Sequence, residues 1–346
     1  MSSSLESPRI ASPSWAMRDG WRLLILIGLT LAPHRAVAAP AAKATKTAPG
    51  PRAASGVRID YTPYQQLLNE HLSVISEPGE PLETRFNYEA YHDQSGRDAR
   101  AEKIRRAFLA VSPSKMDANT RLAWAINFYN YLVLENASQY LLIPDKFRQR
   151  YLSVKDIVIE GVHFFDYPFV TVDSVKYTLN EFEKHFLYLD FDHGINTQPP
   201  SGLDPRVHFA AVNGSLGAAP LQPRAFKPES LDIQLDRAVR QSLASPKHLI
   251  LRSDPPAFQI SSIFGWYIAD FGGAMKVIPW IQRYVSKETS DKLEPYVQRG
   301  TFGVIPWDWK LNQTLGWRFE QQMKQPAPAP GSAKPGMSKA TMRDSI

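Results

Sequence analysis

The sequence contains no cysteine in its 346 residues. This absence excludes disulfide bonds, a thiolate nucleophile, cysteine-ligated zinc or iron–sulfur sites, and a lipid anchor attached through sulfur. Charged residues are sparse at 21%, whereas hydrophobic residues make up 43% of the chain. A chain with this apolar content can bury a packed core, which excludes general disorder.

Long apolar runs are also lacking, apart from one stretch near the amino terminus. Residues 23–32 are almost entirely apolar, which is about half of the ~20 residues that a membrane-spanning helix needs. Arg18 and Arg22 precede the stretch and a small-residue Ala-Val-Ala site follows it, as in a secretory signal peptide. We therefore expect a signal peptide over residues 1–38, cleavage after Ala38, no transmembrane segment, and a periplasmic or secreted protein.

Two further segments are rich in proline and alanine and contain few or no large apolar side chains. Residues 39–56 are predicted to be a flexible linker and residues 325–346 a disordered tail. A single folded domain is therefore expected over residues 57–324. Because Met17 directly precedes the charged start of the signal peptide, translation is expected to begin there, or the first 16 residues to be dispensable.

The net charge of +6 invites a nucleic-acid or anionic-membrane partner, so its location matters. Residues 1–38 carry +2, residues 39–56 carry +3 and residues 325–346 carry +2, which leaves −1 for residues 57–324. The expected domain is therefore not basic, and the sequence predicts no nucleic-acid partner. The basic terminal segments are expected to touch anionic lipid or polymer only weakly.

The spacing of apolar residues predicts an α+β domain. Helices are expected over residues 64–75, 97–111, 120–142 (capped by Asp117), 230–243, 263–271 and 276–285, and another opened by Asn180, with Glu183 completing a capping box. Strands are expected over residues 158–172, 175–179, 207–212, 248–252 and 257–260, with a hairpin turn at Asp173-Ser174. These elements favour one domain with a mostly antiparallel sheet, around which helices from both ends of the chain pack.

Five blocks of this sequence resemble the family known as domain of unknown function 547. They are Trp-Ala-Ile-Asn-Phe-Tyr-Asn at residues 124–130, Tyr-Thr-Leu-Asn-Glu-Phe-Glu at 177–183, Asp-Pro-Arg-Val-His-Phe-Ala at 204–210, Ile-Phe-Gly-Trp-Tyr at 263–267 with Asp-Phe-Gly at 270–272, and Ile-Pro-Trp-Asp-Trp-Lys-Leu-Asn at 305–312. The resemblance implies an exported bacterial protein with a single α+β domain, and it implies little about a substrate.

The chain departs from this family in the loop after the histidine. The family's histidine strand usually runs into a loop with two cysteines, where this chain has Asn213 and Ala218. A histidine–cysteine pair would share a proton between imidazole and thiolate, and without the thiol that chemistry does not carry over. We therefore expect a scaffold that has lost its thiol and that binds a peptide, a cell-envelope fragment or a partner protein at this loop, without a cofactor, as a monomer or weak oligomer.

An alternative keeps catalysis at the same loop. In a hydrolase or acyltransferase, His208 would act as base, with water or Ser215 as nucleophile. However, the sequence around Ser215 lacks the first glycine of a nucleophile elbow and the helix that must follow it. Whether the protein is an enzyme is therefore left open, with the binding function favoured, and a structural envelope component is a third alternative.

Several polar residues are candidates for a binding site near His208. Asp204 and Arg206 are expected either to orient the imidazole and bind a carboxylate, or to close the turn around Pro205.

Within the loop, Asn213, Gly214 and Gly217 are expected to allow a tight backbone path whose N–H groups hold an anion or a carbonyl group. On the long helix, Asn127 and Asn130 either fix neighbouring loops, which we favour, or face a polar cleft.

Two other patterns carry less weight. Glu181 and His185 have a helical spacing that can share a metal, but the sequence places no third ligand, so no metal site is expected. Four tryptophans would suit stacking on a sugar or peptide, although core positions are the commoner outcome: Trp266, Trp280, Trp307 and Trp309.

Overall fold

The computed structural model of the chain describes residues 56–92, 94–141, 153–188, 203–253, 256–297 and 302–314. The expected signal peptide, the linker up to residue 55 and the tail lie outside these residues. None of the helices within the described ranges combines the length and the apolar composition that crossing a bilayer requires.

Helix α4 (Ala118–Leu141) lies at the centre of the amino-terminal half. It begins where expected, because the Asp117 carboxylate accepts hydrogen bonds from the N–H and the hydroxyl of Thr120. The helix is buried on almost every side between Ala123 and Ala137, as a helix in the middle of a core must be. The Trp124 indole is fully buried and donates to the carbonyl of Phe108 at 2.8 Å, which fixes α4 to its neighbour.

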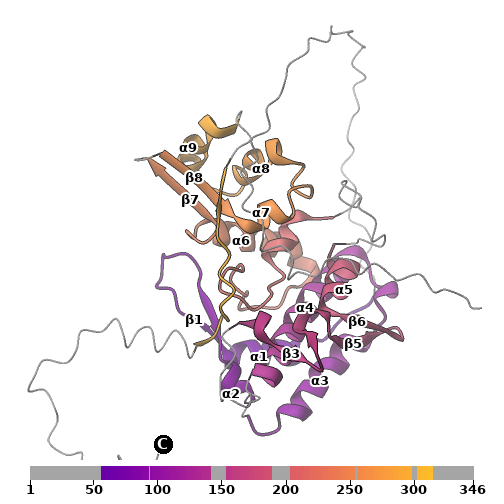
Figure 1. The fold of residues 1–346 in the computed structure, drawn as a ribbon. Coiled ribbons are helices and arrows are strands. Elements are labelled where there is room, and N and C mark those ends of the chain that lie inside the picture. The colour runs from indigo at the N-terminus through magenta and orange to yellow at the C-terminus, as the bar shows by residue number, and fades with distance from the viewer. Residues whose placement is uncertain are drawn as a thin grey trace, which may run out of the picture.

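Small helices and hairpins surround α4 (Figure 1). They are α1 (Thr62–His71), β1 (Leu72–Val74), β2 (Thr84–Phe86), α2 (Tyr88–His92), α3 (Arg97–Leu109), β3 (Val158–Ile159), β4 (Val162–His163), β5 (Pro168–Val172), β6 (Val175–Thr178) and α5 (Leu179–Phe182), followed by a π-helical turn, Glu183–Leu187. The hairpin turn at Asp173 and Ser174 is confirmed, since both residues have positive φ angles.

The carboxy-terminal half begins with a 3₁₀ helix, Pro205–Phe209. It continues through α6 (Leu231–Leu243), β7 (Leu249–Ser253), β8 (Pro256–Ser261), α7 (Ser262–Trp266), α8 (Ala274–Ile281), α9 (Lys287–Val297) and β9 (Gly303–Ile305). Strand β9 pairs in parallel with β8, with Ser261 opposite Ile305, while β7 and β8 are antiparallel.

The α+β class is confirmed, although the strands do not form one sheet. They are divided among three two-stranded hairpins, β1–β2, β3–β4 and β5–β6, and the three-stranded β7–β8–β9 sheet. The long strand expected from residue 158 is interrupted because Glu160 and Gly161 adopt positive φ angles and a 3₁₀ turn follows. Most strand pairs are antiparallel, as expected.

Two local predictions were wrong. The strand expected over residues 207–212 is absent, because Asp204 caps a 3₁₀ helix with Pro205 at its first position. The capping box is formed by Thr178 and Glu181, two residues before the expected pair. The residues after Pro205 are therefore apolar because the 3₁₀ helix is buried on all sides, and not because they form a strand.

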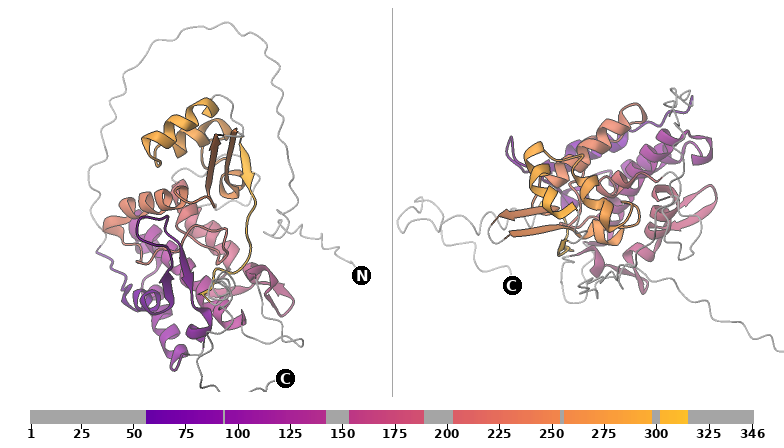
Figure 2. Two further views of the ribbon diagram at one scale, coloured as in Figure 1. Left: turned by 90° about the vertical axis from the view of Figure 1, so that its left-hand side faces the viewer. Right: turned by 90° about the horizontal axis from the view of Figure 1, so that it is seen from above.

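Two hydrophobic cores meet along the segment that carries His208. The larger core surrounds α4, and the smaller one is built from β7, β8, α7 and α8. Val207 and Ala210 belong to the larger core, whereas Phe209 belongs to the smaller one. The 3₁₀ helix thus joins the two halves seen in Figures 1 and 2.

A second connection is the C-terminal strap, residues 302–314. It leaves the β7–β8–β9 sheet and runs down to the amino-terminal half, as the yellow segment in Figures 1 and 2 shows. Isolated bridges join it to three distant segments, pairing Phe86 with Gln313, Ser153 with Lys310, and Ser215 with Leu311.

Candidate functional site

The loop after His208 is held by backbone hydrogen bonds to the C-terminal strap. The N–H of Leu216 donates to the carbonyl of Lys310, and the N–H of Gly217 donates to the carbonyl of Asp308, both at 2.8 Å. They belong to the loop whose N–H groups were predicted to hold an anion or a carbonyl group. Because they are hydrogen-bonded within the protein, they do not serve that purpose here.

Gly214 and Gly217 are needed for this close packing. Gly214 has a φ of +79°, which favours glycine, and a side chain there would press on Val133. A Cβ atom at Gly217 would lie 2.7 Å from the ring of Trp307 and 2.9 Å from the backbone nitrogen of Asp308. The tight backbone path expected for both glycines is therefore explained by the strap that lies against the loop.

Ser215 is fully buried and serves the same junction. Its hydroxyl donates to Asn213 Oδ1 at 2.7 Å and accepts a hydrogen bond from the indole Nε1 of Trp307 at 2.9 Å. Asn213 Oδ1 also accepts from the N–H of Ser215, which closes the turn. The hydroxyl is thus occupied by structural partners.

His208 lies in different surroundings, with its side chain fully buried. Its Nε2 atom is 2.8 Å from Asp270 Oδ2, and its ring stacks on Tyr267 with 3.9 Å between centroids. Burial lowers the pKa of His208, and the Asp270 carboxylate opposes this shift. The structure gives Nδ1 no hydrogen-bond partner within the described ranges.

Tyr188 connects this imidazole to a buried carboxylate, Glu183. The hydroxyl of Tyr188, whose ring is 4.8 Å from that of His208, donates to Glu183 on the π-helical turn. Burial, followed by the Glu183 charge, raises the pKa of Tyr188 well above its ordinary value. Asp270, Tyr188 and Glu183 were not recognised as site residues, although all except Tyr188 stand in the blocks that carry the family resemblance.

The structure does not bring His208 and Ser215 together. Both side chains are described, and no hydrogen bond joins them, since one is paired with Asp270 and the other with Asn213 and Trp307. A serine nucleophile needs a base within hydrogen-bond reach. The serine-hydrolase alternative therefore lacks the geometry on which it depends.

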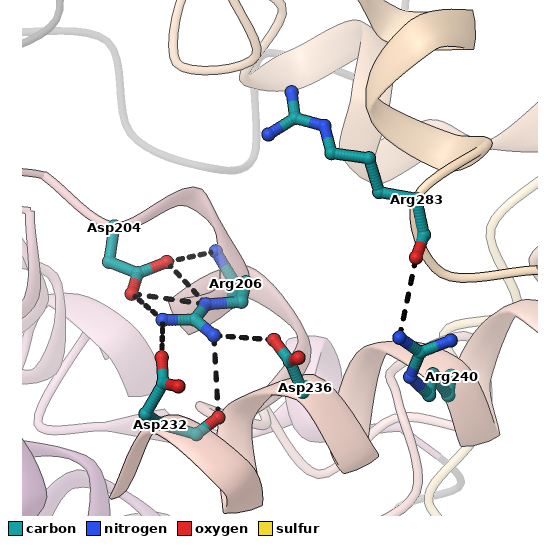
Figure 3. A network of polar contacts seen from close by, with 6 residues as sticks. All are labelled: Asp204, Arg206, Asp232, Asp236, Arg240 and Arg283. Atoms are coloured by element: carbon teal, nitrogen blue, oxygen red, sulfur yellow. Dashed lines mark hydrogen bonds and ion pairs between the residues drawn. The ribbon is translucent and has the colours of Figure 1, made fainter.

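Asp204 and Arg206 form a structural ion-pair network (Figure 3). The Arg206 guanidinium contacts the carboxylates of Asp204 at 2.7 Å, Asp232 at 2.8 Å and Asp236. These contacts, the Asp204 hydrogen bond foremost, raise the pKa of Arg206. The guanidinium ties the 3₁₀ helix to α6 and already has three acidic partners, so it is not directed at a ligand carboxylate.

The helix amides are structural, as favoured from the sequence. Asn127 exchanges two hydrogen bonds with the backbone of Phe226, at 2.7 and 2.9 Å. Asn130 donates to the carbonyl of Ala210 at 2.9 Å and accepts from the N–H of Val212 at 2.8 Å. Each buried amide thus pairs with the backbone of a distant loop, as a neighbouring strand would, and fixes that loop against α4.

The residues considered for a metal do not come together. Glu181 belongs to the capping box, and the His185 ring packs against Tyr177 and Phe186. Within the described residues, no group of three or more histidine, aspartate and glutamate side chains is arranged to hold a metal ion.

The four tryptophans divide into two groups. Trp280 is buried in the smaller core. Trp266, Trp307 and Trp309 gather in one partly exposed cluster, with 4.7 Å between the rings of Trp266 and Trp307. The ammonium group of Lys155 lies 4.3 Å from the Trp309 ring.

A cavity of about 360 Å³ lies against the loop after His208. We call it the loop cavity; it is lined by the β1–β2 connection, the loop after His208, the α6–β7 connection and Asn312. Ala218, which occupies the position of the family's second loop cysteine, is part of its wall. The cavity therefore lies at the loop that the family resemblance marks. The other residues of its wall were not predicted from the sequence.

An ion-pair network crosses one wall of the loop cavity. Glu83 accepts a hydrogen bond from Lys247 at 2.7 Å and another from the Arg85 guanidinium. Burial works to raise the pKa of Glu83, but Lys247 and Arg85 outweigh it and lower the pKa. The wall is thus polar, with its charges paired.

The loop cavity also contains polar groups without partners. His248 is 1% exposed, and neither of its ring nitrogens has a well-formed hydrogen bond within the described part of the chain, although the backbone of Ala218 lies close enough to act on the ring. Burial, together with the neighbouring Lys247 charge, lowers the pKa of His248 to about 4, and the backbone contact with Ala218 opposes this shift. The side-chain oxygen of Asn312 is likewise buried and unpartnered there.

A comparison with known proteins finds a family that is similar to part of this chain, the loop after His208 included. Residues 113–243 match the family described as "Protein of unknown function, DUF547", which confirms the resemblance over that part of the chain. The match includes His208 and the loop after it, and it ends before His248 and the C-terminal strap. No curated protein and no solved structure shows significant similarity to the chain.

Proposed function

We propose that this chain, which resembles the DUF547 family over residues 113–243, is an exported binding protein whose ligand occupies the loop cavity. The observation that carries the proposal is His248, which lines the loop cavity and whose ring nitrogens have no well-formed hydrogen bond in the described residues, with only the backbone of Ala218 acting on the ring. A buried polar group left unpaired costs about 1–3 kcal/mol. A ligand that supplies the missing partners recovers this free energy on binding.

The unpaired groups specify the chemistry of the ligand. A neutral imidazole offers one donor and one acceptor, and the side-chain oxygen of Asn312 offers another acceptor. The ligand must therefore both donate and accept hydrogen bonds, as amide groups do. A peptide, or a cell-envelope fragment that carries one, meets this requirement.

Binding is favoured over catalysis at this cavity. The lowered pKa of His248 makes its imidazole a weak base, and the serine predicted as nucleophile, Ser215, is buried in hydrogen bonds to Asn213 and Trp307. Labelling with serine-directed probes tests the alternative. We expect no modification of Ser215, whereas labelling that depends on His208 would support a hydrolase.

The binding test compares the mature protein with its His248→Leu variant. Soluble muramidase digests of bacterial cell wall and short peptides are titrated while the thermal midpoint is recorded. We expect a ligand-dependent rise for the unchanged protein and little or none for His248→Leu. A His163→Leu variant is the matched control, because His163 is exposed on β4, away from the cavity.

Two results would contradict the proposal. Equal shifts for both proteins would remove His248 from the binding site. No shift with any digest or peptide would favour a structural envelope component.

A further inference from the structure

A second, smaller cavity adjoins the loop cavity. It has a volume of about 150 Å³ and shares Leu82 with the loop cavity. On its other side it shares Arg224 and Arg237 with an open groove of about 1710 Å³ along α1 and α6. The small cavity thus lies between the loop cavity, which it meets at Leu82, and the open groove.

Two guanidinium groups at the small cavity are without anionic partners. Arg224 and Arg237 line its solvent-exposed edge, and neither forms an ion pair within the described residues. Other arginines nearby are fully engaged, since Arg206 contacts three aspartates and Arg240 donates to backbone carbonyls. A pair of unmatched cations at one cavity favours an anionic ligand group, and arginine suits a carboxylate best.

The same cavity contains one unpaired acceptor. The Oε1 atom of Gln241 is buried and has no hydrogen-bond partner in the described part of the chain. Its neighbour Gln234 is satisfied, accepting from Lys227 N–H and donating to the carbonyl of Ala225. A ligand that fits must therefore bring an N–H donor next to its anionic group.

We propose that the small cavity binds the C-terminal carboxylate of a peptide. The carboxylate lies between Arg224 and Arg237, and the last peptide N–H donates to Gln241 Oε1. A free phosphate offers no amide N–H at this position, and a neutral sugar offers no anionic group. A volume of 150 Å³ equals roughly five water molecules, which suits a carboxylate, its α-carbon and a small side chain.

This inference rests on the proposed function, because it makes the small cavity the end of the same ligand site. The probe is N-acetylated trialanine, as the free acid and as its C-terminal amide, titrated calorimetrically into the mature protein. We expect the acid to bind about tenfold or more tightly than the amide, since charge-assisted hydrogen bonds are the stronger ones. The double variant R224Q/R237Q is expected to bind both forms with the weaker affinity.

Two further variants separate the contributions. Q241L is expected to weaken the acid and the amide by a similar factor, because both keep the last N–H. R106Q is the control, since Arg106 lies on the exposed face of α3 and pairs with Glu102 in its own helix.

The outcomes distinguish this inference from the proposed function. If the unchanged protein binds acid and amide equally, the carboxylate site is overturned while binding at the loop cavity stands. If His248→Leu has no effect but the acid is still preferred, the loop cavity fails and the carboxylate site stands. If neither peptide form binds, both are overturned.

Discussion

At the scale of single residues, the chain carries a buried imidazole, His248, that has no well-formed hydrogen bond within the described residues. Most buried polar side chains are hydrogen-bonded, as Asn127, Asn130 and Ser215 are here. His248 departs from that rule at the wall of a cavity, which is where an unsatisfied group has functional meaning. The same side chain therefore lowers the stability of the free protein and favours the binding of a ligand.

Removing this imidazole is predicted to stabilise the free protein. His248→Leu replaces an unpaired polar ring with an apolar side chain, so we expect the free energy of unfolding to rise by roughly 1 kcal/mol. Urea denaturation at pH 7.5 measures it. A clear loss of stability would mean that the ring has a structural partner, and would weaken its assignment to a ligand.

Acidification is predicted to destabilise the protein through the same residue. The pKa of His248 falls from 6.5 to about 4 on burial, so between these values the unfolded state binds more protons than the folded state. Stability from this group is complete above pH 6.5 and declines by about 3 kcal/mol as the pH falls to 4. The buried His208 contributes in the same direction, because its pKa is also lowered.

The measurement is the free energy of unfolding in urea between pH 7.5 and 4. The His248→Leu variant should lose less stability over this range than the unchanged protein. An identical pH profile for the two proteins would show that His248 is not buried as a neutral ring.

A third residue-level prediction concerns Asn130. Asn130→Leu leaves the carbonyl of Ala210 and the N–H of Val212 buried without partners, so we expect a loss of about 2–4 kcal/mol. Thermal and urea unfolding measure the loss, with Asn119→Ala on the exposed first turn of α4 as the control. A loss no greater than that of the control would contradict the structural role.

At the scale of elements, the structure depends on how one irregular loop packs against one irregular strap. Helices α3, α4 and α6 and the β7–β8 hairpin could be read from the sequence, because apolar spacing and capping residues are local signals. The 3₁₀ helix at Pro205 does have a local start signal, the Asp204 cap, which the apolar residues that follow it obscured. The parallel pairing of β9 has none, because it is set by contacts with a distant segment.

The candidate site shows the same division. The family resemblance directs attention to the loop after His208, and its role as a site stays a prediction. The contacts within that loop could not be predicted, because the partners of Ser215 and Gly217 lie about 90 residues further along the chain, in the strap. His248, Arg224 and Arg237 carried no local motif, and only the folded chain places them around cavities.

The loop–strap junction gives an element-level prediction. Gly217→Ala places a methyl group 2.7 Å from the Trp307 ring, so either the strap or the loop must move. We expect a loss of about 1–3 kcal/mol, as for overpacked cores, and a change in tryptophan fluorescence. Gly265→Ala is the matched control, since nothing lies within 4 Å of its added Cβ atom. Similar stabilities for the two variants would contradict the role of Gly217.

At the scale of the whole molecule, two hydrophobic cores share one connecting segment. Val207 and Phe209 are two residues apart and belong to different cores, and the strap spans both halves. We therefore predict one cooperative unfolding transition, with the same midpoint from circular dichroism and from tryptophan fluorescence. Two separate transitions would show that the halves fold as independent domains.

The strap also bears on how the chain reaches its native state. Its bridges join residues 310–313 to Phe86 and Ser153, across more than 150 residues of sequence, so contact order is high where the two halves close. Loop closure of that length precedes the gain from these contacts, which makes folding slow. Because synthesis proceeds from the amino terminus, the two halves cannot join until residues 302–314 have been made. Until then the chain is incompletely folded and can be bound by machinery that carries unfolded polypeptides.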